Sequence, residues 1–199
     1  MSTGPGLPTA ASLTTQDIRR LLAARPKRSL NDPAYVPAAV LLILYPREDG
    51  FHILLQKRTD QVEHHKGEIS LPGGARDPED DTLLATALRE AWEEMGIRPE
   101  DVEVLGELDD TPTRSRFCIS TFVATIPYPY TFRVNPVECA EVLEVPLAAL
   151  LHPSNAREEA RWLDGRLERS YAYAHQHHLI YGATARILQG FLDLLRQGP

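Results

Sequence analysis

The hydrophobic positions of residues 84–95 recur with the period of an α-helix. At about 100° per residue, five of them lie within a stripe about 100° wide, which predicts a helix with one face in a core. They are Leu84, Ala87, Leu88, Ala91 and Met95. The polar residues 80–82 can cap the start of the helix, and Gly96 can supply the left-handed turn that ends it.

Other segments show the patterns of strands. Ala38–Tyr45 is a nearly continuous apolar run, as expected for a strand covered on both faces, and Phe51–Arg58 follows it after a turn, which predicts a hairpin. Further strands are predicted at Val102–Leu108, Ile119–Ile126, Glu141–Val145 and near His178–Tyr181. Two more helices are predicted, a short one from Thr14 or Thr15 to about Ala24 and a final one over about Ala183–Gln197. This order of elements fits a layered α/β architecture.

One face of the predicted central helix carries three glutamates. Glu90, Glu93 and Glu94 are spaced i, i+3 and i+4, roughly 130° round the helix axis from the apolar stripe. Such like-charged neighbours destabilise a bare helix by about 0.2–0.5 kcal/mol per pair, and a bound cation would reverse that cost. Their oxygens suit Mg²⁺ or Mn²⁺ better than zinc, and the adjacent Arg89 can hold one carboxylate bidentately. The alternative is a solvated charged face, the commoner meaning of an isolated Glu-x-x-Glu-Glu.

The sequence around these glutamates resembles the box of the Nudix hydrolases, Gly-x5-Glu-x7-Arg-Glu-(apolar)-x-Glu-Glu-x-Gly-(apolar). Residues 89–97, Arg-Glu-Ala-Trp-Glu-Glu-Met-Gly-Ile, match the second half of the box in full. Gly74 lies one residue further from Arg89 than the general box allows. The first acid of the box is Asp81 or Asp80 here instead of glutamate.

The extra residue is typical of a branch of the family that resembles coenzyme A pyrophosphatases. That branch has an Asp-Pro after the glycines, as in residues 77–78 here, and an upstream signature whose spacing residues 54–74 keep. Arg58 matches an arginine of the signature, whereas four positions differ: Gln56, Thr59, Glu63 and Leu71. Glu63 replaces an arginine and so reverses a charge. The similarity covers roughly residues 36–196.

The resemblance implies a Nudix fold, a mixed β-sheet in an α/β/α sandwich, and a role for several residues. The implied ligands of one to three Mg²⁺ or Mn²⁺ ions are Glu90, Glu93, Glu94 and the backbone carbonyl of Gly73. Arg89 would orient Glu90 for catalysis. The general base is left open between Glu90 and Glu138, which lies in a later loop. Glu141 and Glu144 are weaker candidates for the same role.

Substrate contacts are expected around residues 73–74, which we call the glycine turn. Arg58, Gly74 and the preceding His65 are the first candidates. Arg76, with Lys66, Arg114 and Arg116, could contact phosphate oxygens, although a surface charge explains each of them equally well. Three late histidines, His175, His177 and His178, lack an ordered Cys/His spacing, so we interpret them as a solvated strand end and not as a zinc site.

The expected function is divalent-metal-dependent hydrolysis of a pyrophosphate bond in a nucleoside diphosphate derivative. The resemblance favours coenzyme A or acyl-coenzyme A, which would give 3′,5′-ADP and 4′-phosphopantetheine or its acyl form. One alternative is a broader pyrophosphatase that acts on ADP-ribose, NADH or other dinucleotides. Another is a nucleotide-sensing module without turnover, but such modules typically lose box carboxylates that this chain keeps.

The composition agrees with a globular cytoplasmic enzyme that binds a small nucleotide. The 199 residues are 43% apolar and 25% charged, and the net charge of −7 argues against nucleic acid or an anionic membrane as a partner. The N-terminus has no apolar run long enough for a signal peptide or a membrane span. Cys118 and Cys139 make no disulfide framework, although a bridge between them is left open, as is a homodimer. We expect a flexible tail over residues 1–12, a helix and linker over 13–35 and the Nudix domain over 36–199.

Overall fold

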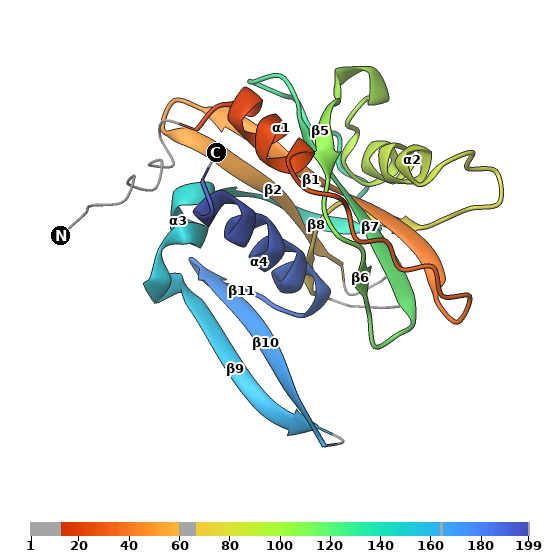
Figure 1. Ribbon diagram of the computed structural model, residues 1–199. Coiled ribbons are helices and arrows are strands. Elements are labelled where there is room, and N and C mark those ends of the chain that lie inside the picture. The colour runs from red at the N-terminus through yellow and green to blue at the C-terminus, as the bar shows by residue number, and fades with distance from the viewer. Residues whose placement is uncertain (1–12, 60–66, 164, 199) are drawn as a thin grey trace.

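A central hairpin organises the fold in the computed structural model, which describes residues 13–59, 67–163 and 165–198 (Figure 1). The hairpin consists of β1 (Val36–Arg47) and β2 (Gly50–Arg58), which pair antiparallel as the sequence predicts. β1 also pairs parallel with β7 (Phe117–Thr125), so the main sheet is mixed.

The other strands of the main sheet extend this core. They are β3 (Ile69–Ser70), β4 (Gly73–Ala75), β5 (Glu103–Glu107), β6 (Thr111–Pro112) and β8 (Cys139–Pro146). The order is β3-β2-β1-β7-β5, while β4 pairs with β1, β6 with β7 and β8 with β2. The strands predicted from the sequence correspond to β1, β2, β5, β7 and β8.

Helices cover both faces of this sheet. α2 (Leu83–Met95) covers one face, whereas α1 (Thr15–Ala23) and α4 (Gly182–Arg196) lie together over the other (Figure 1). The remaining helical elements are short: α3 (Leu147–Leu151) and the 3-10 turns η1 (Pro99–Asp101) and η2 (Pro153–Asn155). The predicted α/β/α sandwich is therefore confirmed.

Strand β1 is apolar throughout because both of its faces are covered. Leu41 and Ile43 belong to the core cluster beneath α2, whereas Leu42 and Leu44 belong to the cluster beneath α1 and α4. All four side chains are fully buried. Successive side chains of a strand point to opposite faces, so a strand between two helical layers has no polar face.

The predicted ends of the first two helices are also confirmed. Thr14 caps α1 in a capping box: its Oγ1 accepts from the Asp17 N–H at 3.2 Å, and its own N–H donates to Asp17 Oδ2 at 3.1 Å. At α2, the Ala85 N–H donates to Thr82 Oγ1 at 3.0 Å. Gly96 ends α2 in the left-handed region with a φ of 67°.

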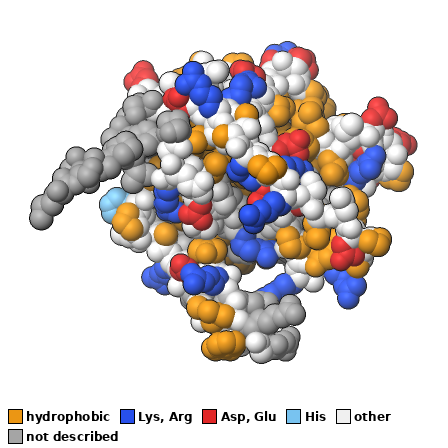
Figure 2. Space-filling view, viewed as in Figure 1, with side chains coloured by type: hydrophobic (Ala, Val, Ile, Leu, Met, Phe, Trp, Pro, Cys, Tyr) orange, Lys and Arg blue, Asp and Glu red, His pale blue; other side chains and the backbone are white. Residues whose placement is uncertain are grey.

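A second, three-stranded sheet follows α3. It consists of β9 (Ala156–Leu163), β10 (Arg166–His175) and β11 (His178–Ile180), in the order β11-β10-β9. The β9–β10 hairpin extends away from the helical layers in Figure 1, and its far end displays hydrophobic side chains in Figure 2. Trp162 and Leu167, which are cross-strand partners, are both exposed there.

The sequence analysis predicted only β11 of this second sheet. It missed β9 and β10, and its interpretation of the late histidines as a solvated strand end is wrong for His178. His178 begins β11 and is buried, while the adjacent His177 is exposed. The physical reason is that β11 packs against the main body, where the strand contacts β3.

Three further expectations concern the chain as a whole. The predicted flexible tail over residues 1–12 lies outside the described residues, so the proposed domain limits stay a prediction. In the part of the chain that the structure describes, no helix is long and apolar enough to cross a membrane. Cys118 and Cys139 are both buried and free, so the bridge that the sequence left open does not form.

Candidate active site

The glycine turn approaches α2 closely because one of its residues has no side chain. β4 pairs with β1 so that Gly73 lies opposite Val40. Gly73 has a φ of 146°, and a Cβ atom on it would lie 2.2 Å from the carbonyl oxygen of Ala39. Glycine is therefore required for the turn to pass between β1 and the glutamates of α2.

Glu94 is the most deeply buried of the three glutamates, with 1% of its side chain exposed. Its Oε2 accepts a hydrogen bond from the Gly73 N–H at 2.9 Å, and its Oε1 lies 3.3 Å from Nη1 of Arg58. Burial nevertheless raises the pKa of Glu94 to about 7, because these contacts replace only part of the lost hydration. A cation beside Glu94 would favour its charged form.

Glu90 lies one turn earlier on α2 and points at the other glycine of the turn. A Cβ atom on Gly74 would lie 2.6 Å from Oε1 of Glu90, so the absence of a side chain makes room for this carboxylate. Burial raises the pKa of Glu90, and the charges of Glu93 and Glu138 raise it further, against the opposing effect of Arg89. Repulsion among these carboxylates shows that they share one site.

Arg89 joins the carboxylates to the loop that precedes α2. Its Nε and Nη2 donate to the two carboxylate oxygens of Asp80 at 3.1 and 3.0 Å. Its Nη1 lies 2.9 Å from Oε1 of Glu90 and 3.0 Å from Oε2 of the more exposed Glu93. The guanidinium holds the pKa of the Asp80 carboxyl well below its usual range. The first acid of the box, which the sequence left open between two aspartates, is therefore Asp80.

Gln56 is a residue of the site that the sequence analysis noted only as a departure from a signature. It is fully buried on β2, and its side chain lowers the pKa of the neighbouring Glu94. Strand alternation could have identified it, because Leu54, Gln56 and Arg58 share the face of β2 that α2 covers. Both polar atoms of its side chain are buried without a hydrogen-bond partner, so the amide keeps a neutral donor available at the base of the site.

The loop before β8 brings Glu138 to the same site. The Asn135 N–H donates to the carbonyl oxygen of Glu94 at 2.9 Å, which fixes the loop against α2. Nδ2 of Asn135 donates to Oε1 of Glu138 at 3.2 Å. The charge of Glu138 raises the pKa of Glu90, so the two carboxylates lie near each other.

The two weaker candidates for the general base lie elsewhere. Glu141 pairs with Lys57 across β8 and β2 and shares its strand face with Leu143 and Val145, which pack in the core beneath α1 and α4. Glu141 therefore faces the side of the sheet opposite α2. Glu144 is paired with Arg47 at 2.7 Å, at the turn end of the central hairpin. The structure thus brings neither residue to the glycine turn.

The predicted substrate-binding residues have different surroundings. Arg58 reaches Glu94, as described, and Gly74 contacts Glu90. Arg76 donates to the carbonyl oxygen of Asp80 at 3.2 and 2.9 Å and so holds the loop before α2, a contact that the sequence did not predict. His65 lies outside the described residues, as does Lys66. Arg114 and Arg116 are exposed in the turn between β6 and β7.

These side chains fit a divalent cation. The buried carboxylate of Glu94 and the largely buried one of Glu90, both with raised pKa values, converge with the half-exposed Glu93 beside a glycine turn. Carboxylate oxygens beside this turn are hard ligands and suit Mg²⁺ or Mn²⁺. These ions keep open coordination positions for phosphate oxygens and water.

Comparison with known proteins agrees with this geometry. A sequence model of the NUDIX domain matches residues 35–165. The chain belongs to the Nudix family. The Nudix hydrolase NudL of Photorhabdus laumondii is 34% identical over 163 residues, which cover 82% of this chain and 86% of the relative. The NudL protein of an Enterobacter species is 35% identical over 178 residues, which cover 89% and 92% of the two chains.

A solved structure supports the fold independently. A MutT/nudix family protein from Enterococcus faecalis superposes with a TM-score of 0.51 at 12% identity, over 92% of this chain and 74% of that one. This Nudix protein is accordingly an enzyme that uses a divalent metal ion to hydrolyse a pyrophosphate bond in a nucleoside diphosphate derivative.

Proposed function

We propose that this Nudix hydrolase cleaves the pyrophosphate of coenzyme A or acyl-coenzyme A. The products would be 3′,5′-ADP and 4′-phosphopantetheine or its acyl form. The observation that carries the proposal is the loop between the glycine turn and α2, which is one residue longer than the general box and contains Asp77-Pro78. In this loop the Asp77 N–H donates to Oδ2 of Asp80 at 3.0 Å, and the Asp80 N–H donates back to the Asp77 carbonyl at 3.0 Å. The extra residue is thus part of an ordered turn that also positions Arg89.

The proposed cation ligands are Glu90, Glu93, Glu94 and the backbone carbonyl of Gly73. When bound, Mg²⁺ or Mn²⁺ would supply positive charge that neutralises the diphosphate oxygens. Arg89 would position Glu90 and Glu93, and Asp80 would fix the guanidinium of Arg89 in turn. Gly73 would hold Glu94 in place through its N–H.

Glu138 is the general base that we propose. Its carboxylate is held by the neutral amide of Asn135, and none of the ion pairs among the described residues includes it. Glu90, in contrast, is engaged by Arg89 at 2.9 Å and is a proposed cation ligand, and both roles weaken it as a proton acceptor. Glu138 would accept a proton from water as the water oxygen forms a bond to one phosphorus atom. The anhydride P–O bond at that phosphorus would break, and the other phosphate would leave with the bridging oxygen.

Four residues would bind the substrate directly or through a neighbouring loop. Arg58 lies at the buried end of the carboxylate cluster, where it would face a diphosphate oxygen. Gly74 would allow the diphosphate to approach the turn backbone. His65 would donate to the substrate, and Arg76 would act indirectly, through the loop that it holds.

A second candidate substrate class is ADP-ribose, NADH and other dinucleotides. Glu63 favours it, because this residue replaces an arginine of the coenzyme A signature and would repel an additional phosphate. A module without turnover is disfavoured because the chain keeps all three box glutamates and Arg89.

The test is a substrate panel with the full chain and either Mg²⁺ or Mn²⁺. The value of kcat/KM for coenzyme A should exceed those for ADP-ribose, NADH and dephospho-coenzyme A by about tenfold or more, as expected for a site that pairs the 3′-phosphate. Chromatography should identify 3′,5′-ADP among the products. Equal or faster turnover of ADP-ribose would contradict the coenzyme A assignment.

A further inference from the structure

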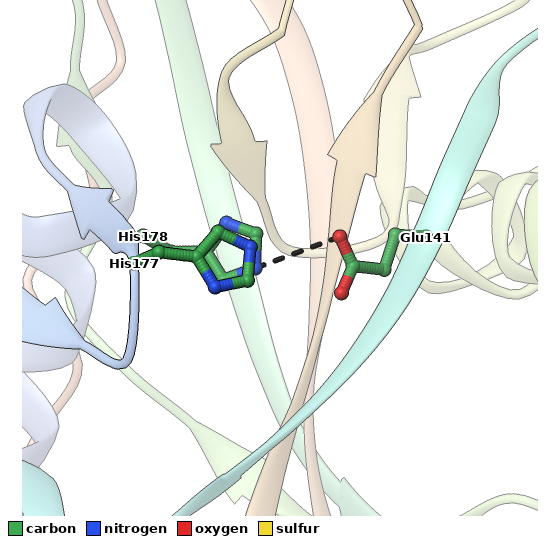
Figure 3. A group of neighbouring side chains, drawn as sticks. All are labelled: Glu141, His177 and His178. Atoms are coloured by element: carbon green, nitrogen blue, oxygen red, sulfur yellow. Dashed lines mark ion pairs between the residues drawn. The ribbon is translucent and has the colours of Figure 1, made fainter.

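Three side chains of metal-binding type meet on the side of the sheet that faces away from α2. Glu141 belongs to β8 of the main sheet, whereas His177 immediately precedes β11 of the second sheet and His178 begins it. One ligand atom from each lies within 4.8 Å of the other two. Figure 3 shows the two imidazole rings side by side, tilted by 40° to each other, and the carboxylate of Glu141 directed at them.

His178 is the least satisfied member of this cluster. Its side chain is 5% exposed, and its buried Nε2 has no hydrogen-bond partner. The closest acidic atom is Oε2 of Glu141 at 3.5 Å, which is longer than a hydrogen bond. A buried ring nitrogen without a partner is unfavourable, and a bound cation would satisfy it.

The arrangement of the two rings also favours a bound cation. The centroids of His177 and His178 lie 3.9 Å apart. At this distance one nitrogen atom of each ring can reach a shared cation. Neutral imidazole is also the form of histidine that binds a metal.

We propose that Glu141, His177 and His178 form a second cation site, selective for Zn²⁺ or a similar transition-metal ion, on the face of the sheet opposite the glutamates of α2. Two imidazoles and one carboxylate are a common zinc ligand set, with a fourth position left for water. Imidazole also distinguishes this site from the all-oxygen ligand set of α2, which suits Mg²⁺ or Mn²⁺.

The distances require only a small adjustment. Ligand atoms of a tetrahedral zinc ion lie about 3.4 Å apart, as follows from bond lengths of about 2.1 Å. Glu141 and His177 are exposed, so both side chains are free to move inward by the difference from 4.8 Å. The buried His178 would stay in place as the fixed ligand.

A cation at this position would connect the two sheets. β8 pairs with β2 in the main sheet, and β11 pairs with β10 in the second one. Zinc would thus join the second sheet to the main sheet through one coordination sphere. Binding to the folded chain alone should raise stability in proportion to the logarithm of the zinc concentration.

The experiment is a zinc titration of the full chain, freed of metal and of any purification tag, in excess Mg²⁺ that occupies carboxylate-only sites. Competition with a chromogenic chelator should show one zinc ion per chain. Glu141→Gln and His177→Ala should each weaken zinc binding by about tenfold or more. Both residues are exposed, so the variants should fold, and circular dichroism would check this. His152→Gln is the matched control and should bind zinc as the wild type does.

Nitrogen NMR of the imidazoles identifies the ligands directly. Zinc should shift the ring nitrogen signals of His177 and His178 and leave those of His152 unchanged. Zinc binding that is equally tight in Glu141→Gln, His177→Ala and the wild type would overturn the proposal. Binding without any shift at these two rings would overturn it as well.

Discussion

The carboxylate of Glu94 is almost completely buried. The Gly73 N–H and Arg58 compensate for part of the lost hydration, but the pKa of the metal-free side chain still rises to about 7. The box pattern predicted that this residue faces a cation, but it did not predict which glutamate is buried most deeply. That difference depends on the distance of each residue from the glycine turn, which only the packed structure defines.

The first prediction concerns the stability of the metal-free enzyme. The folded chain binds the Glu94 proton more tightly than the unfolded chain does, so the free energy of unfolding should fall as pH rises from about 4.5 to about 7. Glu94→Gln lacks this titration, and its loss of stability over that interval should be smaller by about 1–3 kcal/mol. Urea unfolding in a chelating buffer at several pH values measures this. Parallel pH profiles for the two proteins would refute the burial argument.

Gly74→Ala tests the space beside Glu90. The added Cβ would lie 2.6 Å from the Glu90 carboxylate and should displace it. We expect kcat to fall by about 10–100-fold, because small displacements of a positioned group are costly in catalysis. The melting temperature should change by no more than a few degrees, since the Gly74 backbone needs no left-handed conformation. Unchanged kcat would show that Glu90 does not require this space.

At the scale of elements, features that depend on a short segment of sequence were predictable. Packing between distant segments was not. The caps of α1 and α2 and the central hairpin follow from local patterns, and each is confirmed. The β9–β10 hairpin was missed because residues 156–175 mix charged and apolar residues without a clear alternation. The burial of His178 depends on contact between β11 and the main sheet, which no local pattern contains.

The end of α2 gives a prediction at this scale. Gly96 has a φ of 67°, and a Cβ on it would lie 2.7 Å from Cβ of Arg133. Gly96→Ala should therefore lower the free energy of unfolding by about 1–2 kcal/mol or more. The matched control is Gly190→Ala in α4, where nothing lies within 4 Å and alanine favours the helix. Equal stabilities of the two variants, measured by urea unfolding, would count against the role of Gly96 as a cap.

At the scale of the whole molecule, the main sheet lies between the carboxylates near α2 and the carboxylate of Glu141. Glu138 reaches the carboxylates of α2 through the loop that Asn135 anchors, whereas Glu141, three residues later, faces the opposite side. The sequence named Glu138 as a candidate for the base and Glu141 as a weaker one, but it did not show which face of the sheet each residue lies on. The separation depends on the irregular register between Lys57 and Arg58 of β2, against which β8 pairs.

Glu138→Gln tests the proposed base. Without a proton acceptor, kcat should fall by about 100-fold or more. KM should change little, because Glu138 is not a proposed substrate contact. Glu100→Gln, an exposed acid in η1, is the control and should retain wild-type kinetics. A kcat of Glu138→Gln that matches the wild type would assign the base to another residue.

The most direct test of the account is the dependence of coenzyme A hydrolysis on Mg²⁺ in the wild type and in Glu94→Gln. We predict that the wild type is inactive after chelation and regains activity with Mg²⁺. Glu94→Gln should stay about 100-fold or more below it at every Mg²⁺ concentration, because the cation loses its most buried ligand. Hydrolysis by Glu94→Gln with the metal dependence of the wild type would contradict the assignment of the α2 glutamates as the metal site.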